Sequence, residues 1–392
     1  MIASAGSLFA RANTDQDTQL REQARQLAQQ ILIVDTHIDV PERLHEKMED
    51  ISVRTPGGDF DYVRAKAGGL KALFAAVFVP SGMEGSGKAK TYADSMIDLV
   101  RSFAAKWPEK FALVQSPADV TRLAPEGKVL LAMGMENGAA LEGSLANVRY
   151  FYDRGIRYIT LCHSRANHIC DSSFDPKRKW NGLSPFGITL IAEMNRAGMM
   201  IDISHVSDST FYQVIRLSKV PVVATHSSCR AFTPGFERNM SDEMIKVLAE
   251  HGGVIQINFG SAFLKDEVRR VPEKEQKEID RYLKEHGLTS KDPEGKAFLA
   301  EYGKTHPPIF ADVADVARHI DHVAKLVGVD HVGLGSDFDG LGDSLPTGLK
   351  DVSQYPNLIA ELLKLGYSEE DIKKVCGGNI LRVWEEVHRM RD

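Results

Sequence analysis

Short apolar runs recur along the chain, and longer stretches with apolar positions at helical spacing separate them. Eight of the runs are typical of strands buried on both faces, as in a parallel sheet covered by helices. The predicted strands are residues 31–36, 72–79, 129–135, 157–162, 199–204, 221–226, 253–258 and 331–336. The stretches between them predict helices at 16–30, 91–106, 145–153, 185–197, 208–217, 241–251, 312–327, 355–365 and 368–374.

Five of the apolar runs lead into a His, Asp or Glu. The runs end at His37-Ile-Asp39, Glu136, His205, His226 and Asp337. In a parallel α/β fold the carboxyl ends of the strands meet on one face, where the active site is built. An open, doubly wound sheet fits the alternation equally well, but it would hold its first and last strands far apart. We therefore predict an α/β fold, a (β/α)8 TIM-like barrel with insertions in the strand-to-helix loops.

The predicted organisation is a tail and opening helix in residues 1–30, followed by a single barrel domain in 31–392. Residues 45–70 read as a long loop after the first strand. Residues 261–311 are rich in Lys and Glu and read as an insertion on the ligand side, with a solvated helix at 274–284. Insertions at this place serve as lids or as oligomer contacts, or they are solvent-exposed decoration. If the insertion is an oligomer contact, the expected assembly is a homodimer.

Composition narrows the function. The chain has 392 residues and a net charge of −6 without a basic stripe, which argues against nucleic-acid binding, and no apolar run is long enough to span a membrane. The four cysteines lack Cys-x-x-Cys spacing, so we expect buried thiols, with one disulfide as the alternative. Residues 1–12 are small and apolar and end in Ala10-x-Ala12, like the end of a secretory signal, which favours a periplasmic or exported protein over a cytoplasmic one; a disordered tail is the alternative.

The candidate chemistry is that of a binuclear metal site. His37 and Asp39 lie two apart on a strand, so they face the same side. Glu136 follows an apolar strand, where a buried carboxylate is costly unless it is paired or metal-bound, and its two oxygens can bridge two ions. Each of His205 and His226 alone would more often be a core histidine. Together with the Glu and the His-x-Asp pair they predict a second metal, and the nitrogen-rich donor set favours zinc over calcium or magnesium.

Three further residues are candidates beside the metals. Asp337 ends the last strand and is preferred for proton transfer, whereas Asp339 is expected to shape the loop. His163 is a further metal ligand or a donor to a developing oxyanion. Arg238 is a candidate for binding a carboxylate. Cys162 adjoins His163, which raises a thiolate nucleophile as an alternative, but the surroundings favour metal chemistry.

The motifs resemble the renal (membrane) dipeptidase family of zinc peptidases, in a bacterial-type form, from about Val34 to Val387. The matching segments are His37-Ile-Asp39, Gly134-Met-Glu136-Asn, Leu161-Cys-His163-Ser, Asp202-Ile-Ser-His205-Val-Ser, Thr225-His226-Ser-Ser, Glu237-Arg238-Asn239, Gly335-Ser-Asp337-Phe-Asp-Gly340 and Gly377-Gly-Asn-Ile-Leu-Arg382-Val.

The resemblance implies a zinc-dependent dipeptidase with two zinc ions per chain. His37, Asp39 and Glu136 would hold one ion, and Glu136 would bridge to a second ion held by His205 and His226. A metal-bridging hydroxide would attack the peptide carbonyl. The resemblance further implies the roles of the remaining residues: His163 would polarise the carbonyl, Arg238 would bind the substrate carboxylate, and Asp337 would shuttle the proton.

Rival functions share much of this site. A barrel amidohydrolase or deacetylase of N-acyl amino acids would share every metal ligand with a dipeptidase. It would differ only in the groups that lie beyond the metals. A zinc-binding barrel without catalysis would have lost Asp337 or a ligand, yet all are present. A phosphoesterase is a weaker rival, because no phosphate-binding glycine loop is evident.

Overall fold

The computed structural model describes residues 3–391 and shows a nearly closed barrel of eight parallel strands, which confirms the predicted fold class. The ring follows the chain: β1 (Ile33–Ile38), β2 (Leu70–Phe78), β4 (Val129–Glu136), β5 (Ile156–Thr160), β6 (Met200–Asp202), β7 (Val223–Ser227), β8 (Val254–Ile257) and β9 (Val332–Leu334). Two backbone hydrogen bonds join the first and last strands just above the end of β9. Asp39 N donates to Phe338 O at 2.8 Å, and Asp337 N donates to His37 O at 3.0 Å.

All eight predicted barrel strands are present, with bounds within two residues of those expected. The structure adds β3 (Phe111–Leu113), which pairs with β4 outside the ring and has only three residues, too few for a pattern to be recognised. Each predicted helix is present as well. The helices are α1 (Ala3–Gln30), α2 (Val40–Glu46), α3 (Tyr62–Gly68), α4 (Ala89–Lys106), α5 (Pro117–Leu123), α6 (Ala146–Arg154), α7 (Pro185–Ala197), α8 (Asp208–Leu217), α9 (Asp242–Glu250), α10 (Ser261–Leu264), α11 (Asp266–Glu285), α12 (Pro293–Thr305), α13 (Val313–Val327), α14 (Tyr355–Lys364), α15 (Glu369–Lys373) and α16 (Asn379–Arg389).

The prediction of one long loop over 45–70 is wrong, because α3 forms within it and α2 ends at its start. The Asp61 side chain accepts from Arg64 N and caps the first turn of α3. Gly69 ends the helix with a φ of 80°, the left-handed conformation that glycine adopts at no steric cost. Gly69, one of the paired glycines in residues 45–70, is therefore the residue that ends α3.

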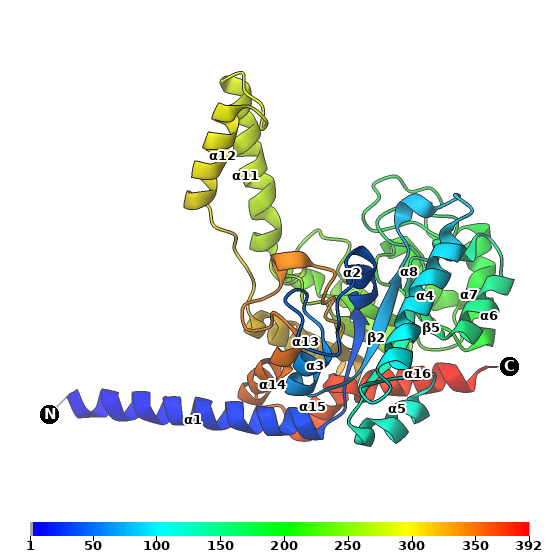
Figure 1. Cartoon of the computed structure of the whole chain (residues 1–392), viewed down its shortest axis with the longest axis horizontal. Helices are drawn as coiled ribbons and strands as arrows, with labels where there is room; N and C mark the ends of the chain where they lie inside the picture. Colours follow the sequence, from blue (N-terminus) through cyan, green and yellow to red (C-terminus); the bar gives the residue numbers. More distant parts are fainter. Residues whose placement is uncertain (1–2, 392) are drawn as a thin grey trace.

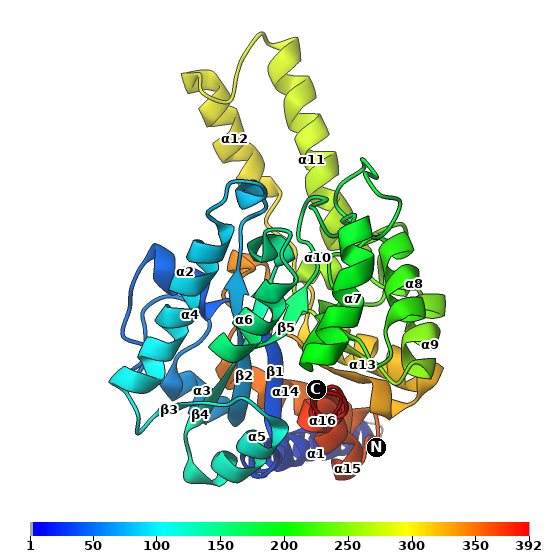
Figure 2. The same cartoon turned by 90° about the vertical axis from the view of Figure 1, so that its right-hand side faces the viewer.

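Two apolar layers hold the barrel together. The inner one fills the ring and includes Phe74, Tyr158 and Trp384, with the rings of Phe74 and Trp384 5.1 Å apart. Trp384 belongs to α16, which crosses the amino-terminal end of the strands and closes it (Figure 2). The opposite, carboxyl-terminal end therefore remains for the functional site. The outer layer packs the surrounding helices against the strands.

The insertion forms a helical hairpin. α11 and α12 project away from the barrel, whereas α1 runs across the opposite end (Figure 1). The hairpin is held by the rings of Tyr282 and Phe298, which stack 3.7 Å apart, and by the Tyr302 hydroxyl, which donates to Glu278 at 2.9 Å. It begins after β8 at the ligand end, where the insertion was expected.

The signal-like segment, residues 1–12, begins outside the described residues. From Ala3 the backbone is helical and runs without a break into the helix predicted for 16–30. Among the described helices, none combines the length and the hydropathy that a membrane crossing requires. All four cysteines are buried and carry free thiols.

Candidate metal centre

The eight predicted site residues converge at the carboxyl end of the barrel. Strands carry three of them: His37 lies in β1, Glu136 ends β4 and His226 lies in β7. Asp39 is the residue before α2. The other four lie in loops that follow strands, namely His163 after β5, His205 after β6, Arg238 after β7 and Asp337 after β9.

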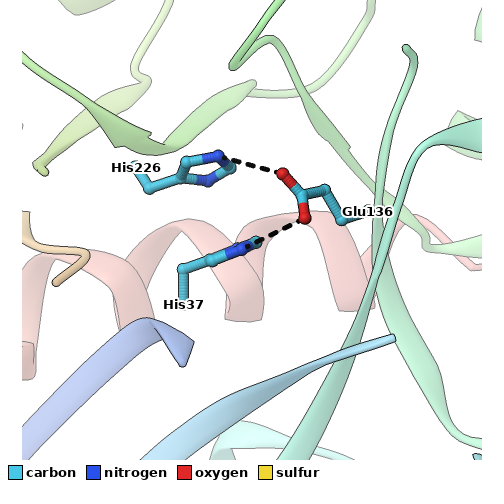
Figure 3. A group of neighbouring side chains, drawn as sticks. All are labelled: His37, Glu136 and His226. Atoms are coloured by element: carbon cyan, nitrogen blue, oxygen red, sulfur yellow. Dashed lines mark ion pairs between the residues drawn. The ribbon is translucent and has the colours of Figure 1, made fainter. Parts of the chain in front are cut away.

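Glu136 stands at the centre of the cluster. Its Oε1 lies 3.4 Å from His226 Nε2, while its Oε2 lies 3.6 Å from His37 Nε2 (Figure 3). The same Oε1 lies 3.0 Å from His205 Nε2. His163 Nε2 is 3.6 Å from the same Oε1. Each oxygen of this carboxylate therefore faces a different set of imidazoles, which is the arrangement that a bridging carboxylate requires.

Three groups of side chains are close enough to hold a metal ion, with ligand atoms all within 4.8 Å of one another. The groups are His37, Glu136 and His226; Glu136, His163 and His205; and His37, Asp39 and Asp337. Glu136 belongs to two of them. His37 Nε2 is buried and has no hydrogen-bond partner among the described residues, so a ligand atom is left free at the centre. Imidazole and carboxylate donors in a buried pocket fit a divalent transition metal.

These groups differ in membership from the two predicted ligand sets. His37 and Asp39 are grouped with Asp337, and His205 is grouped with His163. The predicted second set is nevertheless compact, since the Nε2 atoms of His205 and His226 lie 2.8 Å apart and both face Glu136. His163 and Asp337 thus belong to groups that could hold a metal ion.

The electrostatics suit metal binding at Glu136, His205 and His226. At His37, burial alone would lower the pKa, but Tyr158, Asp39 and Glu136 raise it well above its ordinary value. Burial alone would raise the pKa of Glu136, but the histidines around it hold that pKa well below its ordinary value. Burial, together with His37 and Arg238, lowers the pKa of His226 to about 3. Burial and Arg238 likewise hold the pKa of His205 well below its usual value. The carboxylate is therefore ionised and these two imidazoles are neutral, the protonation states in which they bind metal.

Asp337 belongs to the group that it forms with His37 and Asp39. Its Oδ1 is 3.9 Å from His37 Nε2, and its Oδ2 accepts from Asn258 Nδ2 at 2.7 Å. Burial raises the pKa of Asp337 to about 6, with repulsion from Asp39 adding to the shift. A carboxyl group with a pKa near neutrality can both accept and release a proton.

Backbone strain is concentrated in the loops that carry the site. Four non-glycine residues just after barrel strands have a positive φ: Asn137 (79°), His205 (70°), Asp337 (65°) and Asp339 (67°). Such conformations cost about 1–3 kcal/mol each and persist only where surrounding contacts impose them. Here they direct side chains of the loops back toward the barrel mouth.

Arg238 is buried beside the histidines. Its Nη1 donates to Ser227 Oγ at 2.8 Å and its Nη2 to His226 O at 2.7 Å, with His205 Nε2 at 3.1 Å from the same Nη2. Its Nε has no hydrogen-bond partner in the described part of the chain. The guanidinium therefore keeps one unpaired donor close to the metal centre.

Sequence reasoning missed Asp35 as a functional residue. This buried carboxylate accepts from the backbone N of His37 and of Ser336, both at 3.0 Å, and from the Tyr355 hydroxyl at 2.5 Å. It thereby ties β1 to the end of β9 beside the metal centre. Its position two residues before His37, on the same face of the strand, was the available signal.

Asp339 shapes its loop, as expected. Its Oδ1 accepts from Asp59 N at 2.5 Å, and its Oδ2 lies 3.1 Å from Arg43 Nε. The loop after β9 is thus anchored to α2, which begins just after Asp39.

A cavity of about 710 Å³ opens over the metal centre. Its polar wall includes Glu136, His163 and Asp337, and its rim includes Glu42 and Glu46 of α2. The apolar part of the wall is formed by Phe78, Phe174, Phe263 and Leu341. A space of this size at a buried metal cluster accommodates a small molecule.

Known proteins share both the sequence and the fold. Mouse dipeptidase 3 is 30% identical over 385 residues, which are 96% of this chain and 68% of that protein. Dipeptidase tcpJ of Claviceps purpurea is 33% identical over 337 residues, 84% of this chain and 69% of that protein. The crystal structure of the probable dipeptidase PvdM from Pseudomonas aeruginosa matches with a TM-score of 0.82 and 29% identity, over 95% of this chain and 99% of that one.

A second solved structure is informative about ligands. It is a metallo peptidase from Rhodobacter sphaeroides, liganded with a phosphinate mimic of the dipeptide L-Ala-D-Ala, and it matches with a TM-score of 0.74 and 27% identity over 91% of this chain and 99% of that one. The family described as Membrane dipeptidase (Peptidase family M19) matches residues 21–392. With its barrel and its buried His, Glu and Asp clusters, this chain belongs to that family of metallo-dipeptidases.

Proposed function

We propose that this chain hydrolyses dipeptides with a free C-terminal carboxylate and that it uses two zinc ions bridged by Glu136. The observation that carries the proposal is the position of Glu136, whose two oxygens face different imidazoles at 3.0–3.6 Å. His37 and Asp39 would hold one ion, and His205 and His226 the other. When bound, the ions supply Lewis-acid chemistry, which lowers the pKa of water and polarises a carbonyl group.

His163 and Asp337 are proposed to serve the reacting bond. His163 lines the cavity 3.6 Å from Glu136, from where its ring can donate to the oxygen of the scissile carbonyl. Asp337 is held by Asn258 and has a pKa of about 6, so it can take a proton from the attacking water and give it to the leaving amine.

Arg238 is proposed to bind the substrate carboxylate. Its unpaired Nε is a donor in a site that burial shields from solvent, where a charge-assisted hydrogen bond is strong. Requiring a carboxylate this close to the metals limits the substrate to very short peptides. The metallo peptidase with the phosphinate dipeptide mimic supports the same substrate class.

The test combines metal analysis with three substrates. The purified protein should contain two zinc ions per chain after reconstitution, and it should cleave a free dipeptide but neither its C-terminal amide nor an N-acetyl amino acid. One equivalent or less would refute the bridged pair. Preference for the N-acetyl amino acid would instead identify the amidohydrolase.

Arg238→Met tests the carboxylate contact. It should raise KM for dipeptides by an amount equivalent to roughly 2–5 kcal/mol, because a buried charged pair is lost. Arg149→Met is the control for loss of an arginine, since Arg149 is exposed on α6 and pairs there with Asp153 at 3.0 Å. Equal cleavage of amidated and free dipeptides by the wild-type protein would show that the enzyme does not recognise the C-terminal carboxylate of the substrate.

A further inference from the structure

We infer that the hydroxyl groups of Tyr158 and Thr225 are positioning groups that keep the ring proton of His37 and of His226 on Nδ1. Each imidazole then presents Nε2 to the metal centre. The inference rests on the proposed metal-ligand roles of these two histidines, and it concerns residues that carry no role in the proposed reaction.

Tyr158 bridges His37 and the neighbouring backbone. Its hydroxyl lies 2.8 Å from His37 Nδ1 and 3.1 Å from the carbonyl oxygen of Thr36. The hydroxyl has one hydrogen, and the carbonyl can only accept. Both contacts are satisfied together only when Tyr158 donates to Thr36 and accepts from an Nδ1–H of His37. In the neutral ring the lone pair is then on Nε2, the atom that faces Glu136 and Asp39 at 3.6 Å each.

Thr225 fixes the ring proton of His226 in the same way, because its hydroxyl hydrogen is already used by a second acceptor. Its hydroxyl lies 2.8 Å from His226 Nδ1 and donates to Asp202 Oδ2 at 2.7 Å. The Asp202 carboxylate also accepts from the Thr160 hydroxyl and from the backbone N of Ser204 and of Thr225. The single hydroxyl hydrogen of Thr225 is directed to Asp202 Oδ2, so towards His226 this hydroxyl can only accept, and His226 must supply Nδ1–H.

The packing around Tyr158 shows that its place is specific. A Cβ on Gly134 would lie 1.9 Å from the Tyr158 ring, so only glycine leaves room for the phenol inside the barrel. Gly134 is two residues before Glu136 on β4. The same strand therefore delivers the bridging carboxylate and the space for the group that orients a facing imidazole.

The other two histidines of the cluster lack such a partner. The Nδ1 atoms of His205 and His163 are buried and have no hydrogen-bond partner among residues 3–391. The orienting contacts are therefore confined to one histidine of each proposed zinc site. Outer partners of this kind commonly change metal affinity by about 10–100-fold when removed.

The direct test is the position of the ring protons. Long-range 1H–15N spectra of the zinc-loaded protein, labelled with 15N-histidine, should show Nδ1–H for His37 and for His226, assigned by His37→Asn and His226→Asn spectra. An Nε2–H ring at either position would overturn the inference for that residue. This readout does not use activity, so it can fail while dipeptide hydrolysis stands, and it can succeed if hydrolysis fails.

Zinc affinity, measured by chelator competition, provides the second test. Tyr158→Phe and Thr225→Val should each lower the affinity for one of the two proposed zinc ions by about 10–100-fold. Thr225→Ser keeps the hydroxyl and should restore wild-type affinity. Tyr152→Phe is the matched control, because it removes a hydroxyl 3.1 Å from His388 Nδ1, a histidine outside the metal centre.

Circular dichroism and thermal unfolding establish that each variant is folded before its affinity is compared. Unchanged zinc affinity in both Tyr158→Phe and Thr225→Val would overturn the inference. It would also be overturned if Thr225→Ser lost as much zinc affinity as Thr225→Val.

Discussion

Gly340 offers a sharp test of the site, because it has no room for even one methyl group. A Cβ there would lie 2.4 Å from Asp39 Oδ2 and 2.9 Å from Asp337 Oδ1, whereas ordinary contact begins near 3.4 Å. In Gly340→Ala, the Asp39 carboxylate or the loop must therefore move by about 1 Å. A displacement of this size at a reacting centre can cost about 100-fold in rate.

We expect Gly340→Ala to lower the affinity for one of the proposed zinc ions by at least about 10-fold. We also expect it to lower kcat/KM by about 100-fold at saturating zinc. Chelator competition and dipeptide hydrolysis measure the two effects. Gly82→Ala is the matched control: Gly82 also follows a barrel strand at this end, and a Cβ there meets nothing within 4 Å. Wild-type zinc affinity and rate in Gly340→Ala would show that Asp39 and Asp337 do not need their present positions.

Three further predictions follow from particular side chains. Asp337→Asn should lower kcat by about 10²–10⁴ and leave the metal content unchanged; loss of a metal ion would make Asp337 a ligand. Burial lowers the pKa of His319 to about 4, below its unfolded value near 6.5, so its contribution to stability is complete above pH 6.5 and falls by about 3 kcal/mol as the pH drops to 4. His319→Gln, which can replace both ring hydrogen bonds, should flatten urea-unfolding stability over this range relative to wild type, and an unchanged slope would contradict the assignment. Glu42 and Glu46 lie on the cavity rim without a Lys or Arg ion pair among the described residues, so dipeptides with a Lys side chain should be cleaved a few-fold better than those with Glu, and Glu46→Lys should reduce that ratio.

The fold and the central ligands could be predicted because strong local patterns encode them. Each barrel strand is a short apolar run, and an apolar run that ends in Glu136 places a carboxylate where only a partner can stabilise it. Candidate site residues at the ends of five strands, from the first to the last, distinguished a closed barrel from an open sheet. The strand bounds shifted by no more than two residues, which is the usual uncertainty at strand ends.

What the sequence could not reveal depends on contacts between distant residues. Tyr158 lies within an apolar strand and reads as core, although its hydroxyl reaches His37, which is 121 positions away. Asp339 reads as part of a turn, and only the structure shows its contacts with Asp59 and Arg43. The positive φ of His205, 70°, has no local signature in the sequence. The hairpin helix α12 was missed because its pattern is weakly amphipathic and its packing partner is α11.

The seam between β1 and β9 has a consequence for how the protein is made. A chain emerging from the ribosome presents His37 and Asp39 early, but the residues bonded to them, Asp337 and Phe338, are synthesised some three hundred positions later. All five proposed ligands are already present by His226, yet the strand that fixes two of them is not. Long-range closure of this kind is slow, because the entropy of a very large loop is lost before the contacts form. The complete centre therefore forms only after β9 has been synthesised, and a chain that stops short of β9 exposes an unclosed sheet edge to chaperones and proteases.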